Sequence, residues 1–301
     1  MTHGSREALH DFAHQHLTAA DAERWLGLLR PAFRLEPAGD DAPGPPAGRL
    51  GGLPELPADV EWPVWEGHGP LSFVASLDCA AVPPGALDIP LPAGGTLLFF
   101  YFDGRLDDGE ALVLAELPES RPGSRVLHIP AGAAASAREA PAGLPPYPVV
   151  LLAGRVELTA ADPWHPGIQR AFAPAARPAD RYDHPVCSEK FLDALWDFDG
   201  ETAGHQIGGH AHPVRNPVEL EIAEAVLEAA GRAAGVAPRG AHTDGRRVAE
   251  EAEGWVLLAQ FDSEDGADMM WGDCGALYWL IRPRDLAELR FDRAVFTWQC
   301  G

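Results

Sequence analysis

The sequence has very few basic residues. A single lysine, Lys190, occurs in 301 residues, and 23 Lys and Arg stand against 45 Asp and Glu, which gives a formal net charge of −22. Proteins that bind nucleic acids or anionic membranes neutralise phosphates with a basic patch. The composition therefore excludes most electrostatic binding of nucleic acids and membranes. It also predicts that a charged protein partner presents a basic surface.

Long apolar runs and closely spaced cysteines are also missing. No window approaches the roughly 18 apolar residues of a membrane-spanning helix. The first 16 residues lack the apolar segment of a secretory signal. The four cysteines are far apart and form no C-x-x-C pair: Cys79, Cys187, Cys274 and Cys300. We therefore expect reduced thiols and a cytoplasmic location.

The common catalytic and nucleotide-binding motifs are absent as well. The chain contains no G-x-S-x-G, S-x-x-K, H-E-x-x-H or G-x-x-x-x-G-K, and no G-x-G-x-x-G follows a predicted strand. Cys79 and Cys274 each follow an aspartate. A neighbouring carboxylate raises the pKa of a thiol, which disfavours a thiolate nucleophile. We expect no cofactor.

Apolar residues make up 46% of the chain, enough for a substantial core, while 32 Gly and 29 Pro predict many turns and short strands. Aromatic and β-branched runs predict strands at 71–78, 95–103, 111–117, 125–129, 149–158, 255–261, 276–281 and 294–299. Apolar periodicity predicts helices at 5–17, 19–29, 188–198 and 217–234. Thr18 and Asn216 are the expected N-caps, Pro31 the expected stop of the second helix, and Trp196 is expected on a buried helix face.

Two segments of the chain repeat the same order of features. A Gly-Gly pair, a strand that ends in aspartate and a glycine-led aromatic strand occur at about 50–105 and again at about 205–283. The repeat predicts one α+β domain over the whole chain, with duplicated, intertwined β-rich halves, flanking helices and a helical arm at 5–30. Asp78 and Asp262 are then equivalent strand ends. Each either caps a turn or joins a paired carboxylate site where the halves meet.

Five segments carry a resemblance to a known family: GGLPELPADVEWPVW (51–65), LSFVASLD (71–78), LPAGGTLLFFYFD (91–103), HQIGG (205–209) and LLAQFDSEDGADMMWGDCGALYWLIRPRDLAELRFDRAVFTWQC (257–300). They resemble the YwqG-like family, a bacterial domain of unknown function, and the last segment is the most specific. The resemblance implies an α+β fold of two intertwined β-rich repeats over about residues 20–301. It brings no established activity or catalytic residue. Relatives found beside secreted-toxin systems suggest an immunity or partner-binding role.

The most acidic stretch runs from Asp262 to Asp273. As an EF-hand loop it fails, because its sixth residue is Ala267 instead of Gly and its twelfth is Asp273 instead of Glu. Two alternatives stay open, a looser site for a hard cation and a solvated loop whose apolar residues reach the core. This loop is our first candidate for a ligand-binding surface, through Met270, Trp271 and Gly272.

Histidines form a second cluster. On a strand, His210 and His212 would point to the same side, and with His205 nearby they are candidate metal ligands. The alternative is that these imidazoles only form hydrogen bonds in a loop. His10 and His14 lie one helical turn apart but lack a carboxylate or cysteine at matching spacing, so we expect a solvated helix face there.

Trp62 and Trp65 lie in a proline-flanked stretch and are expected to line a groove between the repeats. Aromatic walls with acidic edges suit a cationic peptide or small molecule. We therefore predict a non-catalytic, cytoplasmic binding module for a protein or peptide with a basic surface, with an immunity-like role as one form of it. The alternative is an enzyme, metal-dependent or not, with a site at the repeat junction formed by Asp78, Asp262, Asp273 and His205.

Overall fold

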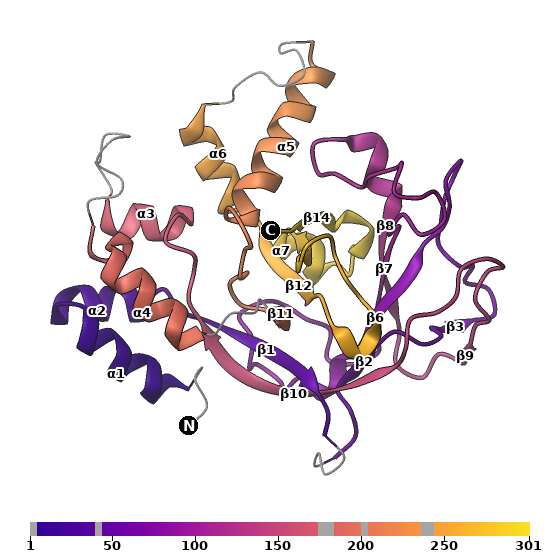
Figure 1. The fold of residues 1–301 in the computed structure, drawn as a ribbon, viewed down its shortest axis with the longest axis horizontal. Helices are drawn as coiled ribbons and strands as arrows, with labels where there is room; N and C mark the ends of the chain where they lie inside the picture. Colours follow the sequence, from indigo (N-terminus) through magenta and orange to yellow (C-terminus); the bar gives the residue numbers. More distant parts are fainter. Residues whose placement is uncertain (1–4, 40–43, 174–183, 200–203, 236–243) are drawn as a thin grey trace.

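The computed structural model describes residues 5–39, 44–173, 184–199, 204–235 and 244–301. Its main element is one ten-stranded antiparallel sheet that curls into a nearly barrel-like shape (Figure 1). The strand order is β14-β13-β12-β11-β1-β10-β2-β6-β7-β8. The strands are β1 (Arg30–Pro37), β2 (Gly48–Leu50), β6 (Ser72–Asp78), β7 (Thr96–Tyr101), β8 (Ser124–Ile129), β10 (Val150–Thr159), β11 (His205–Gly208), β12 (Val256–Asp262), β13 (Ala276–Ile281) and β14 (Val295–Gln299).

Helices flank this sheet in two groups. Figure 1 shows α1 to α4 gathered at one end of the sheet, and α5 and α6 together at another. The helices are α1 (Arg6–His16), α2 (Ala19–Leu26), α3 (Pro166–Phe172), α4 (Glu189–Asp199), α5 (Val218–Ala233), α6 (Gly245–Ala252) and α7 (Pro283–Ala287). Two small ribbons complete the fold, β3 (Glu55–Pro57) with β9 (Ala135–Ala137) and β4 (Val64–Trp65) with β5 (Gly69–Pro70). Among the described residues, no helix is long and apolar enough to cross a membrane.

The strand order confirms the predicted duplication. On one side of the central β1·β10 pair lie β11, β12, β13 and β14, and on the other lie β2, β6, β7 and β8. The strand β1, from the start of the chain, pairs with the late strand β11, while β10 pairs with the early strand β2. Each half therefore contains a strand from the other part of the chain, and the two halves are intertwined in a single α+β domain.

The register of the sheet repeats as well. Asp78 lies opposite Thr96, and Asp262 lies opposite Ala276. In each hairpin, this pair joins the last residue of the first strand to the first residue of the second strand. The pairing of β6 with β7 shifts at residue 74, and that of β12 with β13 shifts at residue 258. These positions are equivalent in the two sequence repeats. The same bulge in both copies shows that the duplication extends to the details of the backbone.

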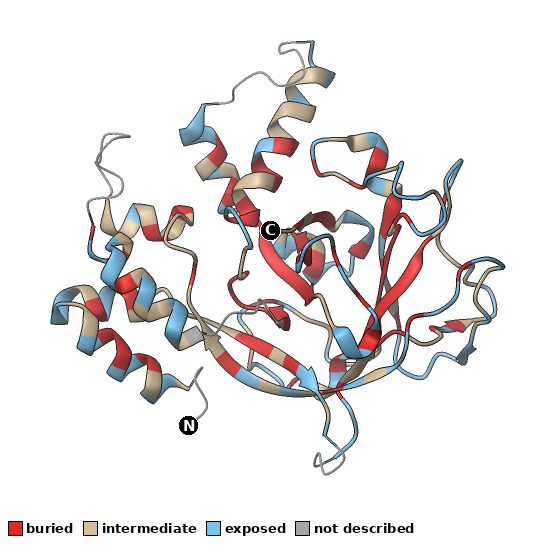
Figure 2. Cartoon of the chain, in the orientation of Figure 1, coloured by how far each residue is buried: buried red, intermediate tan, exposed pale blue. Residues whose placement is uncertain are grey.

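Burial on both faces explains the uninterrupted apolar sequence of β13. Leu277 and Trp279 belong to the main core of the curved sheet. Tyr278 and Leu280 point the other way and pack against Ile222 of α5 in a second cluster. Figure 2 shows the buried residues concentrated on β6, β7 and β12 and on the inner faces of the helices, whereas most of β10 is half-buried or exposed.

The N-terminal helices begin as predicted but end earlier. Thr18 is the N-cap of α2, and its hydroxyl accepts a hydrogen bond from the Asp21 amide at 3.3 Å. The helix ends at Leu26, and Pro31 lies in the central strand β1 instead of stopping the helix. The prediction was wrong because a proline near the start of a strand is compatible with pairing at the other residues.

Further corrections concern short or mixed elements. Residues 111–117 do not form the predicted strand; their backbone wraps around the Ser120 hydroxyl, which bonds to the amide and carbonyl of Leu114. The helix α5 has Pro217 as its N-cap, one residue after the predicted Asn216. The sequence patterns also missed β1, β2, β11, α3 and α6, which are short or interrupted by prolines and charges and so lack a clear period.

Candidate functional site

Two cavities adjoin at one end of the central strands. They measure about 250 and 400 Å³, and Trp196, His212 and Pro213 line both of them. We call the two cavities together the acidic groove, because carboxylates dominate its charged lining. These carboxylates are Glu157, Asp162, Asp262, Glu264 and Asp265. Among the described lining residues, Arg34 is the one Lys or Arg.

Two large apolar side chains reach the solvent in this groove. Trp196 of α4 is 56% exposed and Met270 of the loop after β12 is 54% exposed. The prediction that Trp196 is buried was wrong: Phe191 and Leu195 pack α4 against α1 and α2, whereas Trp196 points into the groove. Exposed apolar side chains beside charged groups are typical of a binding surface.

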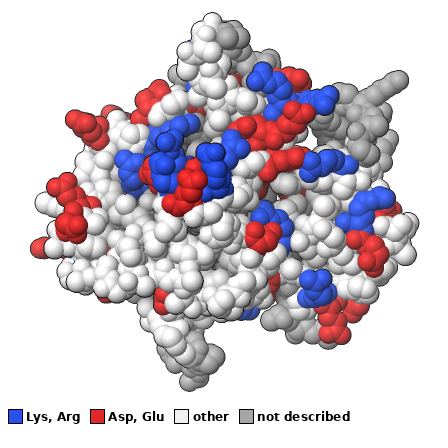
Figure 3. Space-filling view, turned by 180° about the vertical axis from the view of Figure 1, so that it is seen from behind, with Lys and Arg blue, Asp and Glu red and all other residues white. Residues whose placement is uncertain are grey.

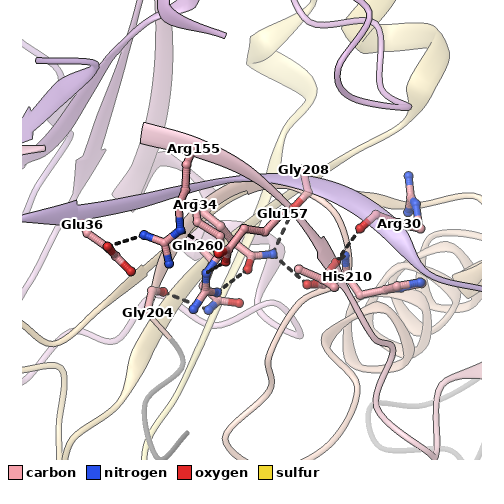
Figure 4. A network of polar contacts seen from close by, with 11 residues as sticks. Arg30, Arg34, Glu36, Arg155, Glu157, Gly204, Gly208, His210 and Gln260 are labelled. Carbon is pink, nitrogen blue, oxygen red and sulfur yellow. Dashed lines mark hydrogen bonds and ion pairs between the residues drawn. The ribbon is translucent and has the colours of Figure 1, made fainter. Parts of the chain in front are cut away.

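Two buried glutamine side chains stabilise the backbone beneath the groove. Gln206 and Gln260 are fully buried and lie opposite each other in the β11·β12 pair. The Gln206 amide donates to the carbonyl oxygens of Gly208 and His210 at 3.0 and 2.7 Å, and the Gln260 amide donates to that of Gly204 at 3.0 Å (Figure 4). Such satisfied buried networks are rigid, so the backbone that carries His210 and His212 is preorganised.

Two arginines balance the charge of Glu157. Arg155 donates to Glu157 at 2.6 Å, and the Arg34 guanidinium lies 4.0 Å from the same carboxylate (Figure 4). Arg155 also pairs with Glu36, and this hydrogen bond lowers the pKa of Glu36. In the described part of the chain, no Lys or Arg lies within ion-pair distance of the other four groove carboxylates: Asp162, Asp262, Glu264 and Asp265.

Asp262 and His205 position the loop after β12. The Asp262 carboxylate accepts hydrogen bonds from the amides of Gly204 and Ser263, both at 2.9 Å. Its own amide donates to Nδ1 of His205 at 3.0 Å. The His205 proton therefore lies on Nε2, which is 3.6 Å from the Glu264 carboxylate. Burial lowers the pKa of His205, so this imidazole is a neutral donor at the back of the groove.

Buried titratable groups gather behind the first cavity. Burial, together with the charge of Glu219, raises the pKa of Asp162 to about 6. Burial raises the pKa of Glu219 itself to about 7 and lowers those of His165 and His210 to about 4 and 3. Perturbed pKa values of this kind cluster at functional sites. The sequence offered no signal for Asp162 and Glu219, because the two residues are far apart along the chain and interact only in the folded protein.

The structure brings some of the predicted site residues together and separates others. His210, His212, Asp262 and Met270 line the acidic groove, and His205 lies beside Glu264. Asp78 is exposed, caps the turn after β6 through the Ala80 amide at 2.9 Å, and is separated from β12 by four strands of the sheet. Asp273 is exposed and lies outside the described lining of the groove.

The predicted aromatic residues serve packing. Trp65 is buried against Phe102, and Trp62 donates its indole N–H to the Leu71 carbonyl oxygen at 2.8 Å. The cavity that Trp62 lines measures about 10 Å³, which is too small for a ligand larger than water. In the acidic loop, Trp271 is buried and donates to the Asp262 carbonyl oxygen at 3.1 Å, while Gly272 is exposed and adopts a φ of 66°.

One group of potential metal ligands occurs within the described ranges. His10, His14 and Glu23 offer ligand atoms within 4.8 Å of one another, and all three residues are exposed. Glu23 supplies the carboxylate that the sequence spacing lacked, because α2 folds back against α1. Among the described residues, none of His205, His210 and His212 belongs to such a group.

A larger cavity, about 940 Å³, lies between α5, α6 and β14. Its Glu221 is engaged by the Thr297 hydroxyl at 2.5 Å and the Gln299 amide at 2.8 Å. Its Arg215 donates to the Cys300 carbonyl oxygen at 2.7 Å. Glu221 and Arg215 therefore already have partners within the protein. Because the smaller acidic groove also exposes Trp196 and Met270, it is the stronger candidate site.

A protein-family model described as a domain of unknown function, DUF1963, matches residues 48–300. The match covers the sheet from β2 to β14 and most of the acidic groove. It leaves out β1, α1 and α2. No curated protein matches the chain.

Proposed function

Because the chain belongs to the DUF1963 family, whose function is unknown, we propose its role from the acidic groove: it binds a cationic, partly apolar segment of a protein or peptide. One combination of features carries this proposal. The groove contains four carboxylates that have no Lys or Arg partner in the described part of the chain, and it also exposes two apolar side chains, Trp196 and Met270.

Each part of the groove has a matching chemistry. Carboxylates attract Lys or Arg side chains, and an exposed indole binds a cation through its π face. Methionine adapts its shape to different apolar groups, as in promiscuous binding surfaces. The net charge of −22 also steers basic partners toward the protein and raises their association rate at low salt.

The finer assignments belong to the same proposal. We place the protein among the YwqG-like members of its family, because the segment 257–300 with the most specific resemblance lies inside the matched region. We also propose a cytoplasmic location and an immunity-like role, in which the bound basic surface belongs to another protein. Two features support this, the net negative charge and the lack of paired cysteines.

Proton-transfer catalysis is the second candidate. Asp162 lines the first cavity, and its pKa of about 6 allows it to exchange a proton near neutral pH. Mass spectrometry of a bound peptide after incubation separates the two functions. A binding module returns the peptide unchanged, whereas an enzyme alters it, and Asp162→Asn then prevents the change.

The binding proposal predicts a strong effect of two groove substitutions. Fluorescence anisotropy is measured with a labelled Lys-Leu-Lys-Leu-Lys-Leu amide and, for comparison, its Glu-Leu counterpart. We expect wild type to bind only the cationic peptide, more weakly at high salt. Trp196→Ala combined with Asp265→Asn should raise the Kd at least about tenfold, because both side chains are exposed lining residues of the groove.

Leu112→Ala combined with Asp59→Asn is the matched control. Leu112 is 48% exposed, Asp59 is exposed, and neither lines the groove. This control should bind like wild type. Equal affinity for the two peptides, or equal loss of affinity in the groove variant and the control, would contradict the proposal.

A further inference from the structure

A second cavity carries the opposite charge to the acidic groove. It measures about 400 Å³ and lies between the start of β8, the end of β13 and the segment before β14. Its charged lining residues are Arg121, Arg125, Arg282, Arg293, Asp285 and Asp292. Figure 3 shows blue Lys and Arg side chains gathered on this side of the molecule. Four arginines against two aspartates form a local excess of positive charge in a protein whose net charge is −22.

Two of these arginines have free guanidinium groups. Arg282 pairs with Glu251 and lies over the Trp255 ring, and Arg293 shares Asp292 with Arg290. Within the residues that the structure describes, the side chains of Arg121 and Arg125 form no hydrogen bond or ion pair, and both residues are exposed. Their donors are therefore available to a ligand.

The cavity wall also contains an unpaired buried donor. Trp279 lines the cavity and is fully buried, and its indole N–H has no hydrogen-bond partner among the residues that the structure describes. A buried N–H without an acceptor costs roughly 1–3 kcal/mol. A ligand that accepts this hydrogen bond would recover part of that cost. The unpaired indole is an observation independent of the arginines, and it points to an acceptor-rich ligand.

We propose that this cavity binds the phosphate group of a small organic phosphate. A phosphate dianion accepts hydrogen bonds from several guanidinium groups at once, which suits arginines that approach from different elements. The cavity volume of about 400 Å³ falls in the range of roughly 300–1,000 Å³ for small-molecule sites, so it has room for more than the phosphate. Trp255 and Phe291 supply apolar surface for the organic part.

Isothermal titration calorimetry at constant ionic strength tests this site. The probes are adenosine 5′-monophosphate, ribose 5-phosphate, inorganic phosphate and adenosine. We expect wild type to bind at least one of the two organic phosphates more tightly than inorganic phosphate, and not to bind adenosine. Arg121→Gln combined with Arg125→Gln should raise the Kd at least tenfold. Trp279→Phe, which keeps an aromatic ring but removes the donor, should raise it about threefold.

Arg246→Gln combined with Arg247→Gln is the control, because both arginines are exposed on α6 and lie outside the cavity lining. It changes the net charge by the same amount and should leave the affinity unchanged. Inorganic phosphate that binds as tightly as both organic phosphates would overturn the organic part of the proposal. No binding of any phosphate by wild type, or equal weakening in the control, would overturn the site itself.

Discussion

Gly51→Ala should lower the free energy of unfolding by about 3 kcal/mol, a large loss for a single added methyl group. Gly51 has a φ of 62°, and a Cβ atom there would lie 2.2 Å from the Pro148 carbonyl oxygen and 2.8 Å from that of Tyr147. The backbone cannot retreat easily, because the Gly52 amide donates to the Tyr147 carbonyl oxygen and Leu50 pairs with Val150.

The variant Gly85→Ala measures the cost of a left-handed backbone conformation without a close contact of the added methyl group. Gly85 has a φ of 71°, but a Cβ atom there would meet no other atom of the described residues within 4 Å. This variant should lose only about 1 kcal/mol, the cost of the left-handed conformation alone. Equilibrium unfolding in urea, followed by tryptophan fluorescence, measures both values. Equal losses would show that the contact with residues 147 and 148 does not determine the effect.

Glu219→Gln should stabilise the protein at pH 8 by on the order of 2 kcal/mol and leave its stability at pH 4 almost unchanged. Burial raises the pKa of Glu219 from 4.5 to about 7, so folding favours its protonated form. The native state is thus stable with respect to this group below pH 4.5. That stability is lost as the pH rises toward and through about 7, where the buried carboxylate ionises. Glutamine is neutral at every pH and removes this loss.

The difference in stability between wild type and Glu219→Gln excludes the contribution of the buried histidines. Burial lowers the pKa values of His165 and His210, which destabilises the native state as the pH falls below 6.5, but it does so in both proteins. Glu224→Gln, an exposed position on the same helix, is the control and should change the stability by less than about 0.5 kcal/mol. A stabilisation by Glu219→Gln that is the same at pH 4 and pH 8 would refute the ionisation argument.

The duplication was readable from the sequence because its signals are local. Strands with apolar faces, terminal aspartates and glycine pairs recur in the same order, and each feature depends on neighbours along the chain. Gly51 and Gly208 both have a positive φ, which only glycine adopts at little cost. The equivalent register of β6·β7 and β12·β13 follows from the same local pattern.

Only part of the acidic groove could be predicted from the sequence. The acidic composition of the loop from Asp262 to Asp273 marked it as a candidate. The sequence did not show which of its side chains are accessible: Trp271 is buried and Met270 is exposed. Trp196 had the spacing of a core residue, yet α4 packs through its neighbour Leu195 and leaves Trp196 in the groove. Sequence periodicity gives the angle around a helix but does not tell which neighbour covers each face.

By itself, the sequence determined the duplicated α+β architecture, most strands of the large sheet, the helices α1, α2, α4 and α5, and the excess of negative charge. The tertiary structure alone decided that four strands of the sheet separate Asp78 from Asp262, that Glu23 completes the His10 and His14 group, and that Asp162 lies close to the buried Glu219. The physical reason is distance along the chain. Strand patterns and turns arise from adjacent residues, whereas cavities, buried carboxylates and their pKa values arise where remote segments exclude water together.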